Sequence, residues 1–387
     1  MHIALSLGGG GARGAYQAGV LRAISRRFPE LNFSILTGIS AGAVNIAYLA
    51  RHAGSLSDAA NDLAKLWLEL TPEQVYDVHA ATLGRNMFRW AGRLASGGIG
   101  GGREPMKGLV DTAPLRKFLN RVLDPSSDGV LPGIAQNIAR GRLHAVALSA
   151  TSYTTGQSHT WIEGENVELW QRPQRRSELV RLTPEHVMAS SALPMLFPAV
   201  QVGSEWFGDG GIRLTAPLSP ALHLGASRIL TVSTRYQRTR SEADKPLTVG
   251  YPPPAQVLSV LYNAVFLDLI DEDILRLRKV NRILSELAPE DRQGMRIVEI
   301  LVMRPSRDLG KLAGDFEVKL PRFFRYLTRG LGTKDTRSPD ILSLVLFQAD
   351  YLRKLIELGE EDADRDAARV EAFLAAESAK NALNAER

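Results

Sequence analysis

The sequence contains no cysteine, which excludes disulfide bonds, thiolate metal sites and cysteine nucleophiles. It also lacks a long uninterrupted apolar segment. The most apolar stretch, residues 34–50, contains Ser40, Asn45 and two glycines, which indicates protein core rather than a membrane span. No basic segment precedes the apolar residues 3–7, so we expect no signal peptide. The chain does have 387 residues, of which 44% are hydrophobic, and this is enough for a substantial buried core.

Neither sign of charge is in large excess. The 47 Lys and Arg residues exceed the 42 Asp and Glu residues only slightly, which gives a net charge of +5. This charge permits attraction to an anionic membrane surface but does not favour nucleic acid as a partner. We therefore expect a cytoplasmic protein that binds no nucleic acid and contacts the inner membrane face peripherally. The oligomeric state stays open.

The first part of the chain has the pattern of a β–α–β unit. Residues 3–7 predict a short apolar strand, residues 15–27 a helix, and residues 35–36 a second strand. Residues 143–150 and 226–235 predict further buried strands. Strands that alternate with helices are typical of parallel sheets, so we expect an α/β fold with a central, mostly parallel sheet flanked by helices.

The second strand leads into the pentapeptide Gly38-Ile39-Ser40-Ala41-Gly42, and an apolar helix follows. A G-x-S-x-G sequence between a strand and a helix is the pattern of a nucleophile elbow. A serine at so sharp a turn needs a strained backbone, and glycines beside it let the turn close and a substrate approach. An ordinary glycine-rich turn fits the same pentapeptide, so the wider context has to decide.

A glycine-rich loop, Gly8 to Gly14, joins the first strand to the first helix and offers several backbone N–H groups to an anion. The loop fits the dinucleotide-binding pattern G-x-G-x-x-G, but the second strand ends in Thr37-Gly38 without the acidic residue that would hold a ribose. A Walker A loop needs a lysine where this chain has Ala15. The interpretation that uses both motifs is an oxyanion hole for Ser40.

The order of residues along the chain limits which residue could be the base that activates Ser40. The triad of an α/β-hydrolase runs Ser, then an acid, then His. Asp209 lies in the segment Gly208-Asp209-Gly210-Gly211, and only His223 follows it among the histidines. His223 has apolar neighbours, which favours a structural histidine. Asp209 is then either a turn former, the usual role of aspartate in such a loop, or the base of a Ser–Asp dyad.

Three motifs in this order resemble those of the patatin-like phospholipases: GGGGARG at 8–14, GISAG at 38–42 and DGG at 209–211. The segment ASSALPMLFPAV at 189–200 resembles the family too, and the resemblance covers roughly residues 3–235. It implies a three-layer α/β fold without a metal or other cofactor. One variable position is Gly211, where alanine is also frequent in the family.

Carried over residue by residue, the resemblance implies that Ser40 is the nucleophile and Asp209 the base. It implies oxyanion donors in the backbone of Gly9, Gly10 and Gly11. The supporting motif glycines are Gly14, Gly38, Gly42, Gly210 and Gly211. A free aspartate has a pKa of about 3.9 and is a poor base for a serine hydroxyl. Desolvation beside apolar residues such as Phe207 would raise this pKa.

The implied function is that of a lipid acyl hydrolase of the phospholipase A or lysophospholipase type, which cleaves carboxylic esters through an acyl-enzyme. Two alternatives stay open: a soluble carboxylesterase or thioesterase with the same dyad, and an inactive patatin fold that serves as a binding module. The intact motifs disfavour the inactive module. The sequence leaves the acyl chain, head group and positional preference open.

Beyond the motifs, the sequence predicts a catalytic domain over residues 1–235 and a mainly helical C-terminal extension over 236–387. A strand near 297–303 is expected to join the sheet, and an apolar helix is expected from about 255 to 287.

Two segments mix apolar and basic side chains in a way that suits lipid contact. Residues 83–107 fit either a plain loop or a mobile lid. Residues 319–330 predict a helix whose Phe323 and Phe324 share one side with arginines beside it. That helix fits either a core position with arginines reaching water, or an interfacial position on anionic lipid.

Overall fold

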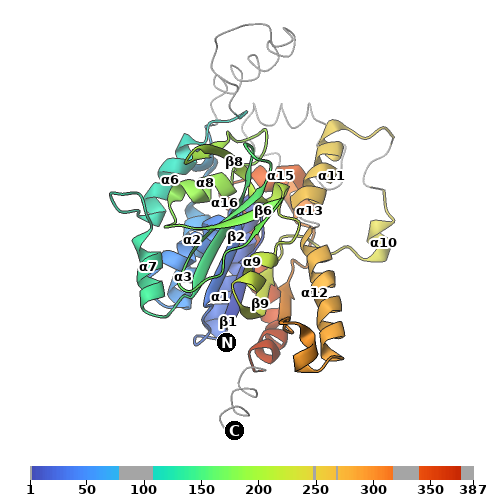
Figure 1. Cartoon of the computed structure of the whole chain (residues 1–387). Helices are drawn as coiled ribbons and strands as arrows, with labels where there is room; N and C mark the ends of the chain where they lie inside the picture. The colour runs from blue at the N-terminus through green and yellow to red at the C-terminus, as the bar shows by residue number, and fades with distance from the viewer. Residues whose placement is uncertain (1, 78–107, 247–249, 267–268, 317–339, 376–387) are drawn as a thin grey trace.

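The structure is a computed structural model, and it describes residues 2–77, 108–246, 250–266, 269–316 and 340–375 (Figure 1). The two segments whose mix of apolar and basic side chains suits lipid contact, 83–107 and 319–330, lie outside the described residues.

The strands of the described residues form one mixed sheet. Five neighbouring strands are parallel, in the order β10, β9, β1, β2, β3. Next to β3 the sheet becomes mixed, since β4 is antiparallel to β3, β6 parallel to β4, and β5 antiparallel to β6. The hairpin β7–β8 joins the sheet through β8, which pairs with β3. The bounds are β1 His2–Leu7, β2 Ile35–Ile39, β3 Ala145–Ser152, β4 Ser158–Gly164, β5 Gln171–Arg172, β6 Arg175–Leu179, β7 Val200–Val202, β8 Glu205–Asp209, β9 Ala226–Val232 and β10 Glu299–Met303.

Helices cover both faces of this sheet, and alternate strand residues serve the two faces. Leu5 and Leu7 of β1 point into the larger core, which contains residues of α1, α2, α3 and α16. Ala4 of the same strand points into the smaller core, with α9 and α12. The expected three-layer α/β architecture with a mostly parallel central sheet is therefore confirmed. The bounds are α1 Gly14–Arg27, α2 Ala41–Arg51, α3 Leu56–Glu69, α4 Pro72–Val75, α6 Ala113–Leu123, α7 Pro132–Ala139, α8 Pro184–Ser190, α9 Ser219–His223, α10 Arg240–Ala243, α11 Pro254–Phe266, α12 Leu269–Ser285, α13 Leu309–Gly314, α15 Asp340–Val345 and α16 Ala349–Arg365, with short 3-10 turns at Gly11–Arg13, Gly210–Ile212 and Pro289–Arg292.

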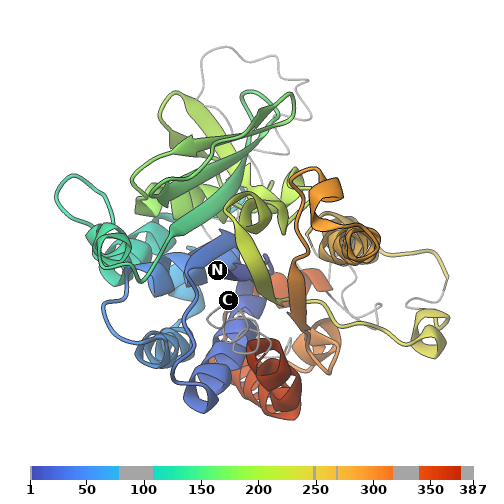
Figure 2. The same ribbon diagram turned by 60° about the horizontal axis from the view of Figure 1, so that its bottom comes forward.

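The C-terminal part of the chain is packed into the same two cores. β10 pairs with β9 in parallel, and Figure 2 shows α16, in red, beside α1, in blue. The two helices approach closely, because a Cβ at Gly19 would lie 2.2 Å from the carbonyl oxygen of Ile356. The Tyr16 hydroxyl also donates to the buried carboxylate of Asp362 at 3.1 Å.

The stretch from about 255 to 287, expected to be helical, is described as α11 and α12, and residues 267–268 between them lie outside the described residues. Asp271 and Glu272 lie in the first turn of α12, where the helix dipole favours negative charge. No helix in the described part of the chain is sufficiently long and apolar to cross a membrane.

Candidate active site

Ser40 lies at the sharp turn between β2 and α2. Its backbone has φ 55° and ψ −128°, a conformation that costs a non-glycine residue on the order of 1–3 kcal/mol. The turn packs directly on the end of β1, because a Cβ at Gly42 would lie 2.2 Å from the carbonyl oxygen of Leu7. A side chain at position 42 would therefore push the turn away from the sheet.

The register of the sheet brings Asp209 to this turn. One edge of β3 is paired with β4. The other edge is shared by β2 and β8, which follow each other along it: Ile39 pairs with Ser149, and Asp209 pairs with the next residue, Ala150. Ser40 directly follows Ile39 in the chain. The nucleophile and the carboxylate consequently meet end to end between two strands that share one neighbour.

The carboxyl group of Asp209 is completely buried. Its Oδ1 accepts a hydrogen bond from the Gly211 N–H at 2.9 Å, whereas Oδ2 has no well-formed hydrogen bond within the described residues. Burial raises the pKa of Asp209 to about 7, although interactions with the Ser40 side chain and the Gly211 N–H act in the opposite direction. A carboxylate with such a pKa is a far better proton acceptor at neutral pH than a free aspartate.

The glycine-rich loop runs next to the nucleophile. A Cβ at Gly9 would lie 3.0 Å from the Cβ of Ser40. Gly10 and Gly11 have φ values of 151° and 55°, which side chains disfavour. The N–H groups of Gly9 and Gly10 donate to no acceptor in the described part of the chain. The loop therefore has two free backbone donors, and Gly9, which carries one of them, lies against Ser40.

The other motif glycines also lie where chain segments meet. At three of these glycines an added Cβ would come within 3 Å of another residue. It would meet Trp67 at Gly14, Gly42 at Gly38, and the carbonyl of Ser149 at Gly210.

Three consecutive residues at the end of α8 hold the backbone of both Ser40 and Asp209. The Ser40 N–H donates to Ser190 Oγ at 3.0 Å, and Ser191 Oγ donates to the Ser40 carbonyl at 3.0 Å. The next residue, Ala192, accepts the Asp209 N–H at 2.9 Å. Ser190 Oγ is anchored in turn on the Ser149 carbonyl at 2.6 Å. This clamp, Ser190-Ser191-Ala192, fixes the strained turn and links the two candidate catalytic residues.

We expect Ser190→Ala to lower kcat/KM at least tenfold, because a misplaced nucleophile loses rate steeply with distance. The substitution leaves the Ser40 N–H without the acceptor it has in Ser190 Oγ, and a buried unpaired group costs about 1–3 kcal/mol. The matched control is Ser25→Ala, which removes an equally buried hydroxyl from α1. Initial rates and thermal melting of both variants test this. Equal kcat/KM for the two variants would show that the clamp does not contribute to catalysis.

The C-terminal part of the chain supports the glycine loop. Arg13, in the loop, is buried and forms an ion pair with Asp340 at 2.6 Å and a hydrogen bond with Ser343 Oγ at 2.7 Å. Gly11 lies against α15 as well, since a Cβ there would be 2.0 Å from the carbonyl oxygen of Leu344. Sequence motifs gave no sign of these contacts, which join positions more than 300 residues apart.

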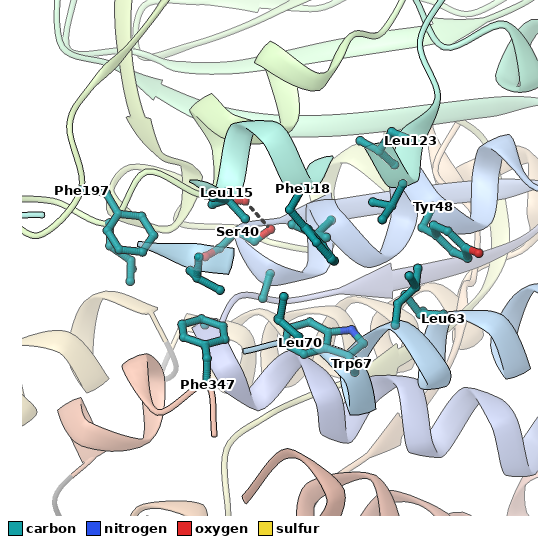
Figure 3. A pocket seen from close by; sticks show the side chains of 18 residues that line it. Ser40, Tyr48, Leu63, Trp67, Leu70, Leu115, Phe118, Leu123, Phe197 and Phe347 are labelled. Carbon is teal, nitrogen blue, oxygen red and sulfur yellow. Dashed lines mark hydrogen bonds between the residues drawn. The ribbon is translucent and has the colours of Figure 1, made fainter. Parts of the chain in front are cut away.

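A narrow apolar pocket opens beside Ser40, between α2, α3 and α6 (Figure 3). The centre of a water-sized sphere can occupy about 60 Å³ inside it, so the space between its walls is larger than this. Phe347 from the C-terminal part closes one side of it near Ser40, opposite Phe197. The residues that line the pocket are Gly11, Ser40, Ala41, Val44, Tyr48, Leu63, Leu66, Trp67, Leu70, Val75, Leu115, Phe118, Val122, Leu123, Ser191, Leu193, Phe197 and Phe347.

His223 takes no part in this arrangement. It lies on α9, which covers the opposite face of the sheet, and its ring stacks on Trp170 with 4.7 Å between centroids. Partial burial, together with the nearby Arg172, Arg175 and Arg296, lowers the pKa of His223. The histidine is therefore a packed surface residue.

The comparison with protein families agrees with these motifs. The family described as patatin-like phospholipase matches residues 5–222, more than half of the chain. The protein therefore belongs to the patatin-like phospholipase family, whose name indicates lipid acyl hydrolysis. No curated protein sequence matched the chain.

Several solved structures are distantly similar to this one. They include VipD from Legionella pneumophila, with 14% identity and a TM-score of 0.33, covering 92% of this chain and 67% of that one. Human GIVD cytosolic phospholipase A2 in complex with methyl gamma-linolenyl fluorophosphonate has 12% identity and a TM-score of 0.47, covering 97% and 59%. The type III effector ExoU has 14% identity and a TM-score of 0.31, covering 98% and 62%. The chain thus spans between 59% and 67% of the length of these proteins, and none of these similarities bears on its reaction.

Proposed function

We propose that the protein is a lipid acyl hydrolase that cleaves carboxylic esters of phospholipids or lysophospholipids. Ser40 Oγ attacks the ester carbonyl carbon while its proton passes to Asp209. The alcohol leaves with that proton, and an acyl group remains on Ser40. Water then attacks the acyl-enzyme, Asp209 takes one of its protons and returns it to Ser40, and the fatty acid is released.

The observation that carries the proposal is the placement of Ser40 beside a buried carboxylate with a raised pKa. Two further features support it. The free N–H groups of Gly9 and Gly10 are suited to stabilise the oxyanion of a tetrahedral intermediate. The pocket beside Ser40 is lined almost entirely by apolar side chains, which suits the acyl chain of a lipid.

A substrate screen tests the proposal. Purified protein is assayed against phospholipids, lysophospholipids, triglycerides, acyl-CoA thioesters and p-nitrophenyl esters. Release of fatty acid from phospholipids or lysophospholipids supports the lipase. Activity on soluble esters or thioesters alone would favour the esterase alternative with the same dyad. If no substrate is turned over and a fluorophosphonate does not react with Ser40, the inactive binding module remains.

A phospholipase has to reach a bilayer, and we propose that residues 319–330 contribute to a peripheral membrane contact. The double variant Phe323→Ser/Arg325→Glu removes an aromatic side chain and reverses one charge. Because each basic residue near an anionic surface contributes roughly 1 kcal/mol, we expect binding to phosphatidylserine vesicles to weaken at least tenfold. Co-sedimentation at low and high salt measures this.

The control for the membrane experiment is Arg27→Glu, which reverses an exposed charge on α1. Binding should increase with the anionic lipid fraction and decrease with salt for this control as for the wild type. Unchanged vesicle binding of the folded double variant would assign residues 319–330 to the protein core instead.

A further inference from the structure

The pocket beside Ser40 has a defined far end. Tyr48 closes it together with Leu63 and Leu123 (Figure 3). Tyr48 is held in place, because the Arg51 guanidinium lies over its ring at 5.7 Å from the centroid. Arg51 also donates to the carbonyl oxygen of Val122, which ties α2 to α6 at this end. The end wall is thus fixed by a cation–π contact and an inter-helix hydrogen bond.

Three helices line the pocket in matching layers from Ser40 to this wall (Figure 3). Ser40, directly before α2, and Val44 and Tyr48 on α2 line the pocket at intervals of about one turn, and Ala41 lines it next to Ser40. On α6 they run from Leu115 beside Ser40 to Leu123 beside Tyr48. The lining runs along the axes of its helices, so the helix rise gives the length of the pocket.

The length follows from the sequence spacing. Ser40 and Tyr48 are eight residues apart, as are Leu115 and Leu123, and eight residues of helix rise by about 12 Å. An extended carbon chain advances by roughly 1.2 Å per bond. A saturated chain that starts at an acyl carbonyl on Ser40 therefore reaches Tyr48 after about ten bonds.

We propose that this pocket selects acyl chains of about ten to twelve carbons and that Tyr48 sets the upper limit. The inference rests on the proposed function, since it places the ester carbonyl at Ser40. A shorter chain leaves part of the apolar lining uncovered. A longer chain either displaces Tyr48 from its contact with Arg51 or holds its terminal carbons outside the pocket.

The chain-length profile of the wild type is the first test. We measure kcat/KM for p-nitrophenyl esters from four to eighteen carbons, each below its solubility limit. Every added methylene that is buried is expected to raise kcat/KM about fourfold, until the chain reaches about ten to twelve carbons. Beyond that length kcat/KM should fall, by at least tenfold at sixteen carbons. A profile that keeps rising to eighteen carbons would overturn the proposal.

Two variants move the limit in opposite directions. Tyr48→Ala opens the far wall, so the preferred chain should become longer by about four carbons, the length of one helical turn. Val44→Phe fills the pocket one turn from Ser40, so the preferred chain should shorten to about six carbons. The matched control is Tyr251→Ala, which removes the same ring from a 94% exposed position and should keep the wild-type profile. If Tyr48→Ala does not fold, Tyr48→Leu makes the same test with a smaller shift.

Binding separates this inference from the proposed function. The affinities of saturated fatty acids from six to eighteen carbons are measured by calorimetry, which needs no turnover. An inactive protein whose affinity peaks at ten to twelve carbons, with the peak moved in Tyr48→Ala, would defeat the hydrolase and retain the chain-length limit. An active protein with the same profile in wild type, Tyr48→Ala and Val44→Phe would retain the hydrolase and defeat the limit.

Discussion

Replacement of Ser40 by alanine is expected to abolish ester hydrolysis, with a loss of about a thousandfold or more, because the hydroxyl is the nucleophile. The fold should survive. The hydrogen bonds that residue 40 donates to Ser190 Oγ and accepts from Ser191 Oγ hold its backbone rather than its side chain. The variant also removes an interaction that lowers the pKa of Asp209, so that pKa should rise further. Circular dichroism tests whether the fold survives, and initial rates with the best ester of the screen measure the loss of activity.

The same residue should react with a fluorophosphonate probe. Mass spectrometry of the labelled, digested protein should place the adduct on the peptide that contains Ser40, and Ser40→Ala should not be labelled. Labelling at a different serine would move the site elsewhere. Wild-type turnover by a pure Ser40→Ala preparation would end the assignment of this pocket as the active site.

Local constraints explain why the motifs were visible in the sequence. The elbow around Ser40 needs glycine at position 42, because the carbonyl of Leu7 occupies the space of a side chain. At Gly9 a side chain would crowd Ser40, because a Cβ there would lie 3.0 Å from the Cβ of Ser40. Requirements of this kind fix single positions within one β–α–β unit and leave a readable pattern. The β–α–β start could be predicted for the same reason.

Long-range contacts left no such pattern. Ser190 and Ser191 were seen only as part of a family-like segment, and their bonds to Ser40 depend on how α8 meets the end of β2. Phe347 lines the pocket from a position more than 300 residues beyond Ser40. Tyr48 reads as one more apolar residue of a buried helix. Its place at the end of the pocket follows from Arg51 and α6, which only the structure brings together.

The register of the sheet could not be predicted from the sequence either. The sequence placed Asp209 in a glycine-rich segment but did not show that β8, which ends at Asp209, continues along β3 where β2 stops. This end-to-end arrangement buries the carboxylate next to the nucleophile. Burial in turn raises the pKa of Asp209 to about 7, which addresses the weakness of a free aspartate as a base.

The second large effect is expected for Asp209→Asn, with a loss in kcat/KM of at least a hundredfold and up to about ten-thousandfold. Asparagine has nearly the same shape, and its side-chain oxygen can still accept the Gly211 N–H, but the amide cannot take the proton from Ser40. His223→Ala should retain most of the activity, because His223 packs on Trp170 away from the pocket. The reverse result would indicate a Ser–His arrangement.

The pH dependence of activity follows from the same carboxyl group. The ionised form is the base, so kcat/KM of the wild type should rise with pH through about 7 and level off above it. A rise centred near pH 4 would mean that Asp209 is as well solvated as a free aspartate, and would contradict the buried site.

Stability should change with pH in the opposite direction. The folded protein keeps the Asp209 proton between about pH 4 and pH 7, while the unfolded chain has already released it. The free energy of unfolding should therefore fall as the pH rises through this range, by up to about 4 kcal/mol at 1.36 kcal/mol per pKa unit.

Asp209→Asn has no such proton to lose. We expect this variant to be less active but more stable than the wild type at pH 8, and the difference to shrink toward pH 4. Urea unfolding of both proteins at several pH values measures it, and parallel curves would show that Asp209 is not buried as a proton acceptor.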